Sequence, residues 1–397
     1  MNCEKIRKNF PQLKQGFIYF DSGSTSLKPR PVIEAVTDYY NTLSVNVGRG
    51  IHRPSSLATK AYKSAHEKLR HFLNGQGYII FTKNCTEAIN IVSHGLDWKP
   101  GDKIVTTYLE HNSNLLPWLD LRPLGVEVSL IKCGDDGSLN LKDFEEAIGE
   151  KTKLVAVTHA SNVLGYIVPV EEITKIAKKK GVMVLIDGAQ AAPHIKVDLD
   201  SIGCDFYAGS GHKMCGPSGT GFLYIKEDAF DHLKPTMLGG GSATEVEFDK
   251  ITFTEGPSIF EAGTPNIAGG IGLGAAVDFL QNIGMSEIRK HELALLEYLL
   301  DKLMTIKDII IYGPGDLKQR TGVVSFMIGD IPAHRIAIIL DELGGIAIRS
   351  GHHCAFLLTH KILKQVCGTA RVSFYLYNTF EEIDHFVETL HEVIKYV

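Results

Sequence analysis

The chain has 397 residues, of which 44% are hydrophobic and 22% charged, a composition typical of a globular protein with about two domains. Lys and Arg number 41 against 46 Asp and Glu, and a net charge of −5 argues against nucleic-acid binding. The chain has no apolar run of about eighteen residues and no signal peptide, so we expect no membrane span. Seven cysteines without a Cys-x-x-Cys pair favour reduced thiols over disulfides or a zinc site. These scattered cysteines predict a cytoplasmic protein.

From residue 78 onward, short apolar runs alternate with helical patterns. The expected strands are 78–82, 103–107, 126–132, 153–159, 182–187, 205–208 and 221–225, and the helices between them include 86–96, 141–148 and 169–180. Most of these strands are continuously apolar or β-branched, as expected when both faces of a sheet are covered. The alternation predicts an α/β domain with a mostly parallel central sheet and right-handed crossovers.

A different pattern follows. Residues 239–265 look like a loop, and 267–304 look like one long helix. After them we expect strands at 309–312, 321–328, 346–348 and 371–377, and helices at 332–343 and 381–396. These elements predict a smaller C-terminal α+β domain. The expected division is an N-terminal segment 1–20 that packs with the small domain, a large domain 21–265, and the small domain 266–397.

A lysine stands on a glycine-rich turn in Ser210-Gly211-His212-Lys213, directly after an expected strand. A buried lysine loses part of its hydration, so its pKa falls and its amine can form a Schiff base and then act as a base. The alternative is a surface lysine in a glycine-rich turn, and this motif taken by itself favours that alternative.

Asp187 ends the apolar strand 182–187, at the edge where α/β proteins bind ligands. Pyridoxal 5'-phosphate (PLP) needs an acid against its pyridinium nitrogen. Gln190, three residues further on, is close enough in sequence to reach the ring hydroxyl. The alternative is an ordinary helix N-cap aspartate. The later Lys213 favours the cofactor interpretation.

Two further strand ends carry polar residues. The amides of Cys85 and Thr86 begin a helix after the strand 78–82, so they can bind a phosphate, although a capped helix start without ligand is the alternative. His111 follows the strand 103–107, where it can stack on a flat cofactor and shuttle protons, unless it is one of the structural histidines among 16. Asn162 lies at a third strand end.

The C-terminal part contains a candidate thiol and a candidate carboxylate-binding cation. Cys354 ends the sequence Arg349-Ser350-Gly351-His352-His353-Cys354 on an expected loop, where its thiolate pKa can be lowered; the alternative is a buried free cysteine. The adjacent histidines diverge in direction, so we expect no metal. Arg371 on a strand can bind a carboxylate bidentately or form a surface or interface charge pair.

Together these motifs resemble the cysteine desulfurases of the class V aminotransferase group, within the fold-type I PLP enzymes. The resemblance is closest to the SUF-type branch and the selenocysteine lyases. It extends from Tyr19-Phe20-Asp21 to Tyr377-Asn378-Thr379, and the motifs around Asp187, Lys213 and Cys354 occur in the family's order. It implies a large PLP-binding domain and a small domain that carries the persulfide cysteine.

The resemblance also implies residue roles. Lys213 forms the Schiff base, Asp187 pairs with the pyridinium nitrogen, Gln190 reaches the ring hydroxyl with Asn162 nearby, and His111 stacks on the ring. The phosphate is held by Cys85, Thr86, Ser210 and His212, with Thr264 reaching the phosphate of the partner subunit in a homodimer. Arg371 binds the substrate carboxylate, Arg349 and Asn46 are secondary substrate contacts, and Cys354 accepts sulfur.

The implied activity converts L-cysteine to L-alanine and leaves a persulfide on Cys354. The sulfur then passes to an acceptor protein for assembly of iron–sulfur clusters or other sulfur-containing cofactors. The alternatives are a selenocysteine lyase, a class V transaminase or epimerase, and a non-catalytic assembly scaffold.

The sequence departs from the family at Asn112 and Gly48, where histidine is frequent, and at Phe356-Leu357-Leu358, where a polar residue and proline are usual. The loop before Cys354 looks short and ordered. We therefore expect slow turnover without the acceptor protein.

Overall fold

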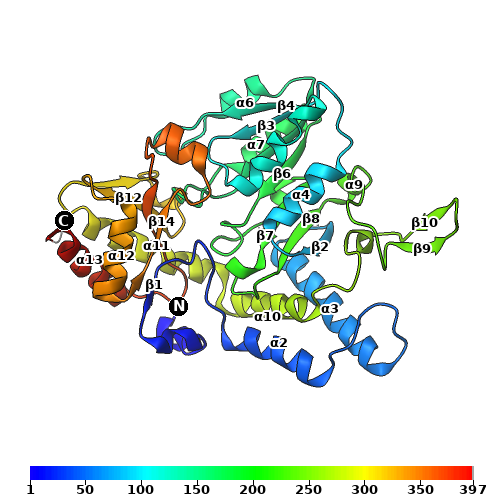
Figure 1. Cartoon of the computed structure of the whole chain (residues 1–397), viewed down its shortest axis with the longest axis horizontal. Coiled ribbons are helices and arrows are strands. Elements are labelled where there is room, and N and C mark those ends of the chain that lie inside the picture. Colours follow the sequence, from blue (N-terminus) through cyan, green and yellow to red (C-terminus); the bar gives the residue numbers. More distant parts are fainter. Residues whose placement is uncertain (396–397) are drawn as a thin grey trace.

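The computed structural model describes residues 1–395, and a large and a smaller β-sheet lie side by side in it (Figure 1). Within these residues the large sheet has the strand order β2-β8-β7-β6-β5-β3-β4. Strand β8 runs antiparallel to β2 and β7, and the other pairs are parallel. The strands are β2 (Tyr78–Thr82), β3 (Lys103–Thr107), β4 (Glu127–Ile131), β5 (Thr152–Thr158), β6 (Met183–Asp187), β7 (Phe206–Ser210) and β8 (Gly221–Ile225). The predicted mostly parallel α/β sheet is confirmed.

The large sheet is covered on both faces, which explains its continuously apolar strands. Successive side chains point to opposite faces, so Val155 and Val157 of β5 join one core while Leu154 and Ala156 join the other. The first core includes residues of α3 (Arg53–Phe72), α7 (Val170–Lys179) and α10 (Ile267–Ile283). The second includes residues of α4 (Cys85–Gly95) and α9 (Glu227–Phe230).

The smaller sheet is antiparallel throughout, in the order β11-β12-β15-β14. Its strands are β11 (Ile309–Tyr312), β12 (Val323–Ile328), β14 (Arg349–Gly351) and β15 (Thr369–Ser373). Its apolar core includes residues of α11 (Met285–Leu303), α12 (Ala333–Gly344) and α13 (Phe380–Lys395). Residue 396 of the predicted last helix lies outside the described residues.

The N-terminal segment joins the C-terminal part of the chain. Strand β1 (Ile18–Tyr19) pairs in parallel with β13 (Ile346–Ala347), and the buried Phe20 belongs to the core of the smaller sheet. The other helices are α1 (Cys3–Arg7), α2 (Arg30–Thr42), α5 (Leu116–Leu119), α6 (Leu141–Ala147) and α8 (Leu199–Ile202). Among residues 1–395, no helix combines the length and apolarity that crossing a membrane requires.

The clearest differences between predicted elements and the structure are the following. The expected helix 267–304 is two helices, because Gly284 has φ 92° and ψ 124°, a conformation outside the helical region that glycine adopts without a Cβ clash. The expected loop 239–265 contains a hairpin, β9 (Ala243–Val246) and β10 (Ile251–Phe253), which extends away from the body of the molecule (Figure 1). The expected strand 371–377 begins at Thr369 and ends at Ser373.

The division of the chain at residues 20 and 265 stays a prediction. Helix α10 begins just after residue 265 and packs against α2 and α3. This packing is close because α10 is rich in glycine: a Cβ at Gly270 would lie 2.6 Å from the Tyr62 ring, and one at Gly274 would lie 2.8 Å from the Ala65 Cβ.

Candidate active site

A cavity of about 250 Å³ lies at the carboxyl edge of the large sheet. Thr158, Asp187 and Ser210, the last residues of β5, β6 and β7, line it together with the start of α4. The smaller-sheet region and the N-terminal segment close the other side. The predicted site residues that line this cavity are Cys85, Thr86, His111, Asn162, Asp187, Gln190, Ser210, His212, Lys213, Arg349, Cys354 and Arg371.

Lys213 ends a single 3-10 turn, Gly211–Lys213, directly after β7. Burial lowers the pKa of its amine, and the nearby Asp187 carboxylate opposes this effect only in part. A lowered pKa increases the fraction of neutral amine, which is the form that attacks a carbonyl carbon.

Asp187 is 4% exposed, and one of its two oxygens is occupied within the chain. Its Oδ1 accepts hydrogen bonds from the Ala189 backbone N–H at 2.9 Å and from the Cys85 thiol at 3.2 Å. Burial, with the Asp187 charge in addition, raises the pKa of Cys85 well above its usual value, so this thiol stays protonated and donates. No group of residues 1–395 donates to Asp187 Oδ2, so this oxygen can accept from a ligand.

The side-chain amide of Gln190 has a hydrogen-bond partner for its nitrogen but none among the described residues for its oxygen. Its Nε2 donates to the Gly23 carbonyl at 2.7 Å. Its Oε1 is buried and has no hydrogen-bond partner among the described residues. A buried acceptor without a partner is costly unless a ligand donates to it.

Polar groups at the start of α4 form hydrogen bonds with two other segments of the chain. The Asn84 side chain caps the helix by accepting from the Glu87 N–H at 2.9 Å. The Cys85 N–H donates to the Ser210 hydroxyl at 3.0 Å, so this expected phosphate-binding amide is bonded within the chain. The hydroxyls of Thr86 and Ser113 lie 2.7 Å apart and both line the cavity.

His111 lines the cavity with one ring nitrogen already hydrogen-bonded. Its Nδ1 accepts from the Ser113 N–H at 3.0 Å, which places the ring proton on Nε2. Burial is the largest cause that lowers its pKa to about 4, followed by the positive charge of Lys213, and Asp187 opposes them.

Arg371 is almost fully buried and already holds several partners. Its Nη2 donates to Asp21 Oδ1 and to the Ser24 hydroxyl, each at 3.0 Å, and its Nη1 donates to the Asn162 carbonyl at 2.8 Å. Its Nε is buried without a partner among residues 1–395. Arg349 donates to the same Ser24 hydroxyl at 2.9 Å. A substrate carboxylate in this cavity would therefore bind near Arg371 and Arg349, and Asp21 holds both guanidinium groups in place.

Cys354 is exposed, but its backbone is held by the large-sheet region. Its carbonyl accepts from the Asn112 N–H at 2.7 Å, and the preceding His353 carbonyl accepts from Asn162 Nδ2 at 2.7 Å. Both His353 (φ 53°) and Cys354 (φ 56°) are left-handed, which is uncommon for residues with a Cβ. Because the Asn112 backbone makes the contact, this bond does not depend on the side chain that departs from the family at this position.

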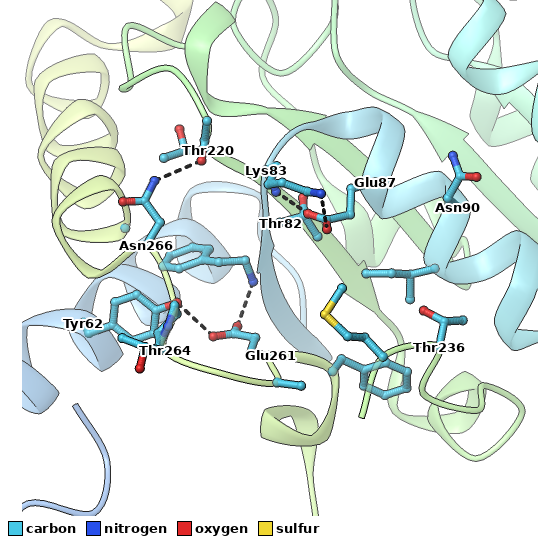
Figure 2. A pocket seen from close by; sticks show the side chains of 18 of the residues that line it. Tyr62, Thr82, Lys83, Glu87, Asn90, Thr220, Thr236, Glu261, Thr264 and Asn266 are labelled. Atoms are coloured by element: carbon cyan, nitrogen blue, oxygen red, sulfur yellow. Dashed lines mark hydrogen bonds and ion pairs between the residues drawn. The ribbon is translucent and has the colours of Figure 1, made fainter. Parts of the chain in front are cut away.

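Asn46 and Thr264 do not line this cavity. Asn46 Nδ2 lies 3.4 Å from Thr264 Oγ1, and both border a separate groove of about 1020 Å³. Thr264 also lines an adjoining pocket of about 410 Å³, shown in Figure 2. In that pocket Glu261 accepts hydrogen bonds from the Tyr62 hydroxyl and the Phe81 N–H, which anchors the chain just before Thr264.

Sequence reasoning missed several residues that shape the cavity. Asp21 and Ser24, in the N-terminal segment, orient the two arginines. Neither residue stands at the end of a predicted strand or in a periodic pattern, so no sequence signal marks them. Ser113 was recognisable, since it lies two residues after His111 in a polar run.

Comparison with known proteins places the chain in a family. The family model for class-V aminotransferases matches residues 18–386. A probable cysteine desulfurase from Halalkalibacterium halodurans is 46% identical, with 100% of this chain and 99% of the relative covered. A cysteine desulfurase from Haloferax volcanii is 43% identical over 94% of this chain and 88% of the relative.

Solved structures agree. A cysteine desulfurase from Thermococcus onnurineus has a TM-score of 0.95 and 43% identity, covering 99% of this chain and 98% of the other. One from Escherichia coli has a TM-score of 0.93 and 32% identity, covering 100% and 99%. The chain therefore belongs to the cysteine desulfurases of the class-V aminotransferase family, which confirms the family expected from its motifs.

Proposed function

We propose that this protein is a PLP-dependent cysteine desulfurase that converts L-cysteine to L-alanine and transfers the sulfur to Cys354 as a persulfide. The observation that carries the proposal is the single cavity of about 250 Å³ that Lys213, Asp187, Arg371 and Cys354 all line. These residues come from the large-sheet region and the smaller-sheet region, so the arrangement exists only in the folded chain.

The residues present fit PLP. Asp187 has a carboxylate oxygen left for a pyridinium N–H, because the described part of the chain donates to its Oδ1 alone. Gln190 Oε1 is a buried acceptor in need of a donor. The Thr86 and Ser113 hydroxyls, with His212, suit a phosphate at the start of α4. Lys213 would hold the aldehyde carbon covalently.

When bound, PLP supplies an electron sink for the charge that develops at the substrate Cα. Arg371 and Arg349 bind the substrate carboxylate, and Asp21 keeps their guanidinium groups in place. The Lys213 amine, whose pKa is lowered by burial, removes the proton from Cα and returns a proton to the substrate.

Sulfur transfer involves Cys354 and His111. The Cys354 thiolate forms a bond to the substrate sulfur while the substrate Cβ–S bond breaks, and the electron pair of that bond stays on Cβ. A proton then converts Cβ to the methyl group of alanine. The proton that the Cys354 thiol loses balances the proton that Cβ gains. His111, whose Nδ1 already accepts from Ser113, donates a proton from Nε2 to the reacting groups and regains one there from the thiol.

The remaining proposals concern partners and location. Asn46 and Thr264 lie outside the cavity of their own chain, which supports a homodimer in which each subunit contributes them to the other's site. The exposed Cys354 supports transfer of sulfur to an acceptor protein, and a backbone held in place supports slow turnover without it. All seven cysteines are free, which supports a reducing cytoplasmic location.

The test is mass analysis of the cysteine-containing peptides after incubation of the PLP-loaded protein with L-cysteine. We expect one added sulfur atom on Cys354 and release of alanine, at a rate that an acceptor protein increases. Cys367, which is also exposed and free, is the matched control and should remain unmodified. Alanine release with unmodified Cys354 in every sample would contradict the persulfide mechanism.

A further inference from the structure

The turn that carries Lys213 is fixed from outside by residues 25–28. The carbonyl of His212, in the peptide bond that leads into Lys213, accepts from the Ser26 N–H and the Ser26 hydroxyl at 3.0 Å each and from the Thr25 hydroxyl at 3.1 Å. The Ser26 hydroxyl also accepts from the Cys215 N–H at 2.8 Å. The segment thus contacts the turn on both sides of Lys213.

A cation completes this arrangement. The Lys28 ammonium donates to the His212 carbonyl at 2.9 Å, to the Thr25 hydroxyl at 3.1 Å and to the Ser26 carbonyl. All of these acceptors are neutral oxygens, and among residues 1–395 Lys28 forms no ion pair with a carboxylate. Burial lowers the pKa of Lys28 to about 8.

A partly buried ammonium without a counter-ion is an expensive way to hold a turn, since neutral hydroxyls and amides serve the same purpose at lower desolvation cost. A charged donor does, however, orient a carbonyl more strongly than a neutral one. Here that carbonyl belongs to the peptide plane attached to the Lys213 Cα. Fixing this plane restricts where the amine can point within the cavity.

We propose that Lys28 is a positioning residue for Lys213, acting through its ammonium contact with the His212 carbonyl. The inference rests on the proposed function, because it assumes that the Lys213 amine is the group that captures PLP. It predicts that the Lys28 charge affects how fast Lys213 reacts more than how tightly substrate binds.

The experiment compares Lys28→Met with Lys28→Arg, which keeps the charge and the donor. The cofactor is removed, PLP is added back, and the rate of its attachment to Lys213 is followed by borohydride trapping and peptide mass analysis. The values of kcat and KM for cysteine are measured in parallel. Lys307→Met, at a side chain 89% exposed, is the matched control.

For Lys28→Met we expect the attachment rate and kcat to fall by about 10-fold with little change in KM, since small misplacements of a reacting group have large kinetic effects. Lys28→Arg should recover most of both rates, and Lys307→Met should match the wild type. If Lys28→Met does not fold, Lys28→Gln replaces it with the same expectation.

Wild-type attachment and kcat in the Lys28→Met protein, or an Arg variant no faster than the Met variant, would overturn the inference. These outcomes leave the proposed function intact. A wild-type protein that attaches no PLP at Lys213 would instead overturn the proposed function and this inference with it.

Discussion

The two ends of the cavity are built in different ways. At one end, Asp187 is the last residue of the buried strand β6, and Lys213 ends the turn that follows the buried strand β7. Asp187 is held by hydrogen bonds from the Ala189 N–H and the Cys85 thiol. At the other end, Cys354 is exposed on a left-handed segment between β14 and β15 that is held through two backbone carbonyls.

This difference follows from what each end has to do. Proton transfer at the substrate Cα needs an amine and an acid in fixed positions, which the end of a parallel sheet provides. Sulfur transfer needs a thiol that meets the substrate on one side and a second protein on the other, which a loop at the surface provides. The comparison predicts that a substitution at one end of the cavity abolishes the chemistry of that end without changing the reactivity of the other.

The largest effect is expected from Lys213→Ala. Alanine formation should fall by at least ~1,000-fold, because the proposed base at Cα and the proposed PLP-capturing amine are the same group and are lost together. The Cys354 thiol should still react with iodoacetamide at the wild-type rate, measured by mass analysis. A large change in that rate would show that the ends are not independent.

Cys354→Ser is the reciprocal variant. Persulfide formation and alanine release from cysteine should fall to background, since the proposed sulfur-accepting thiol is absent. Attachment of PLP to Lys213, followed by borohydride trapping, should keep its wild-type rate. Selenide release from selenocysteine that survives this substitution would favour the selenocysteine lyase alternative.

Asn162→Ala tests the link between the ends. It removes the hydrogen bond to the His353 carbonyl, so we expect persulfide formation on Cys354 to slow by about 10-fold, the kinetic equivalent of one hydrogen bond of ~1.4 kcal/mol. PLP attachment should change less than persulfide formation. The opposite order would show that Asn162 mainly serves the cofactor.

The smallest effect is expected from Glu110→Gln, at the sheet end. Burial raises the pKa of Glu110 from 4.5 to about 8, although Thr107, Asn114 and the Thr158 N–H all donate to it. A raised pKa contributes stability that is fully present below pH 4.5 and is lost as the pH rises through about 8. At low pH the wild type should therefore have a Tm a few degrees higher than that of the variant, and this difference should disappear as the pH rises from 4.5 to about 8.

Thermal melts of both proteins at several pH values measure this difference. The rate of Cys354 alkylation serves as the control, because Glu110 makes no hydrogen bond to residues 349–354 in the described chain. A pH-independent difference in Tm would contradict a protonated carboxyl at this position.

The sequence predicted the large-sheet end better than the other parts of the site. Asp187 and Lys213 were recognisable because strand ends are marked by local apolar runs and by glycine-rich turns. The helix break at Gly284 and the β9–β10 hairpin were missed, since an apolar helical pattern continues across the glycine and the hairpin strands are short and largely exposed.

The succession of strands along the chain, the polar residues at their ends and the family to which the motifs are similar were properties of the sequence alone, because each depends on residues close together in the chain. The contacts of Asp21 with Arg371 and of Lys28 with His212 were decided only by the tertiary structure. Each joins groups far apart in sequence, and such a contact forms only when packing of the two sheets and their helices has brought the N-terminal segment across the carboxyl edge.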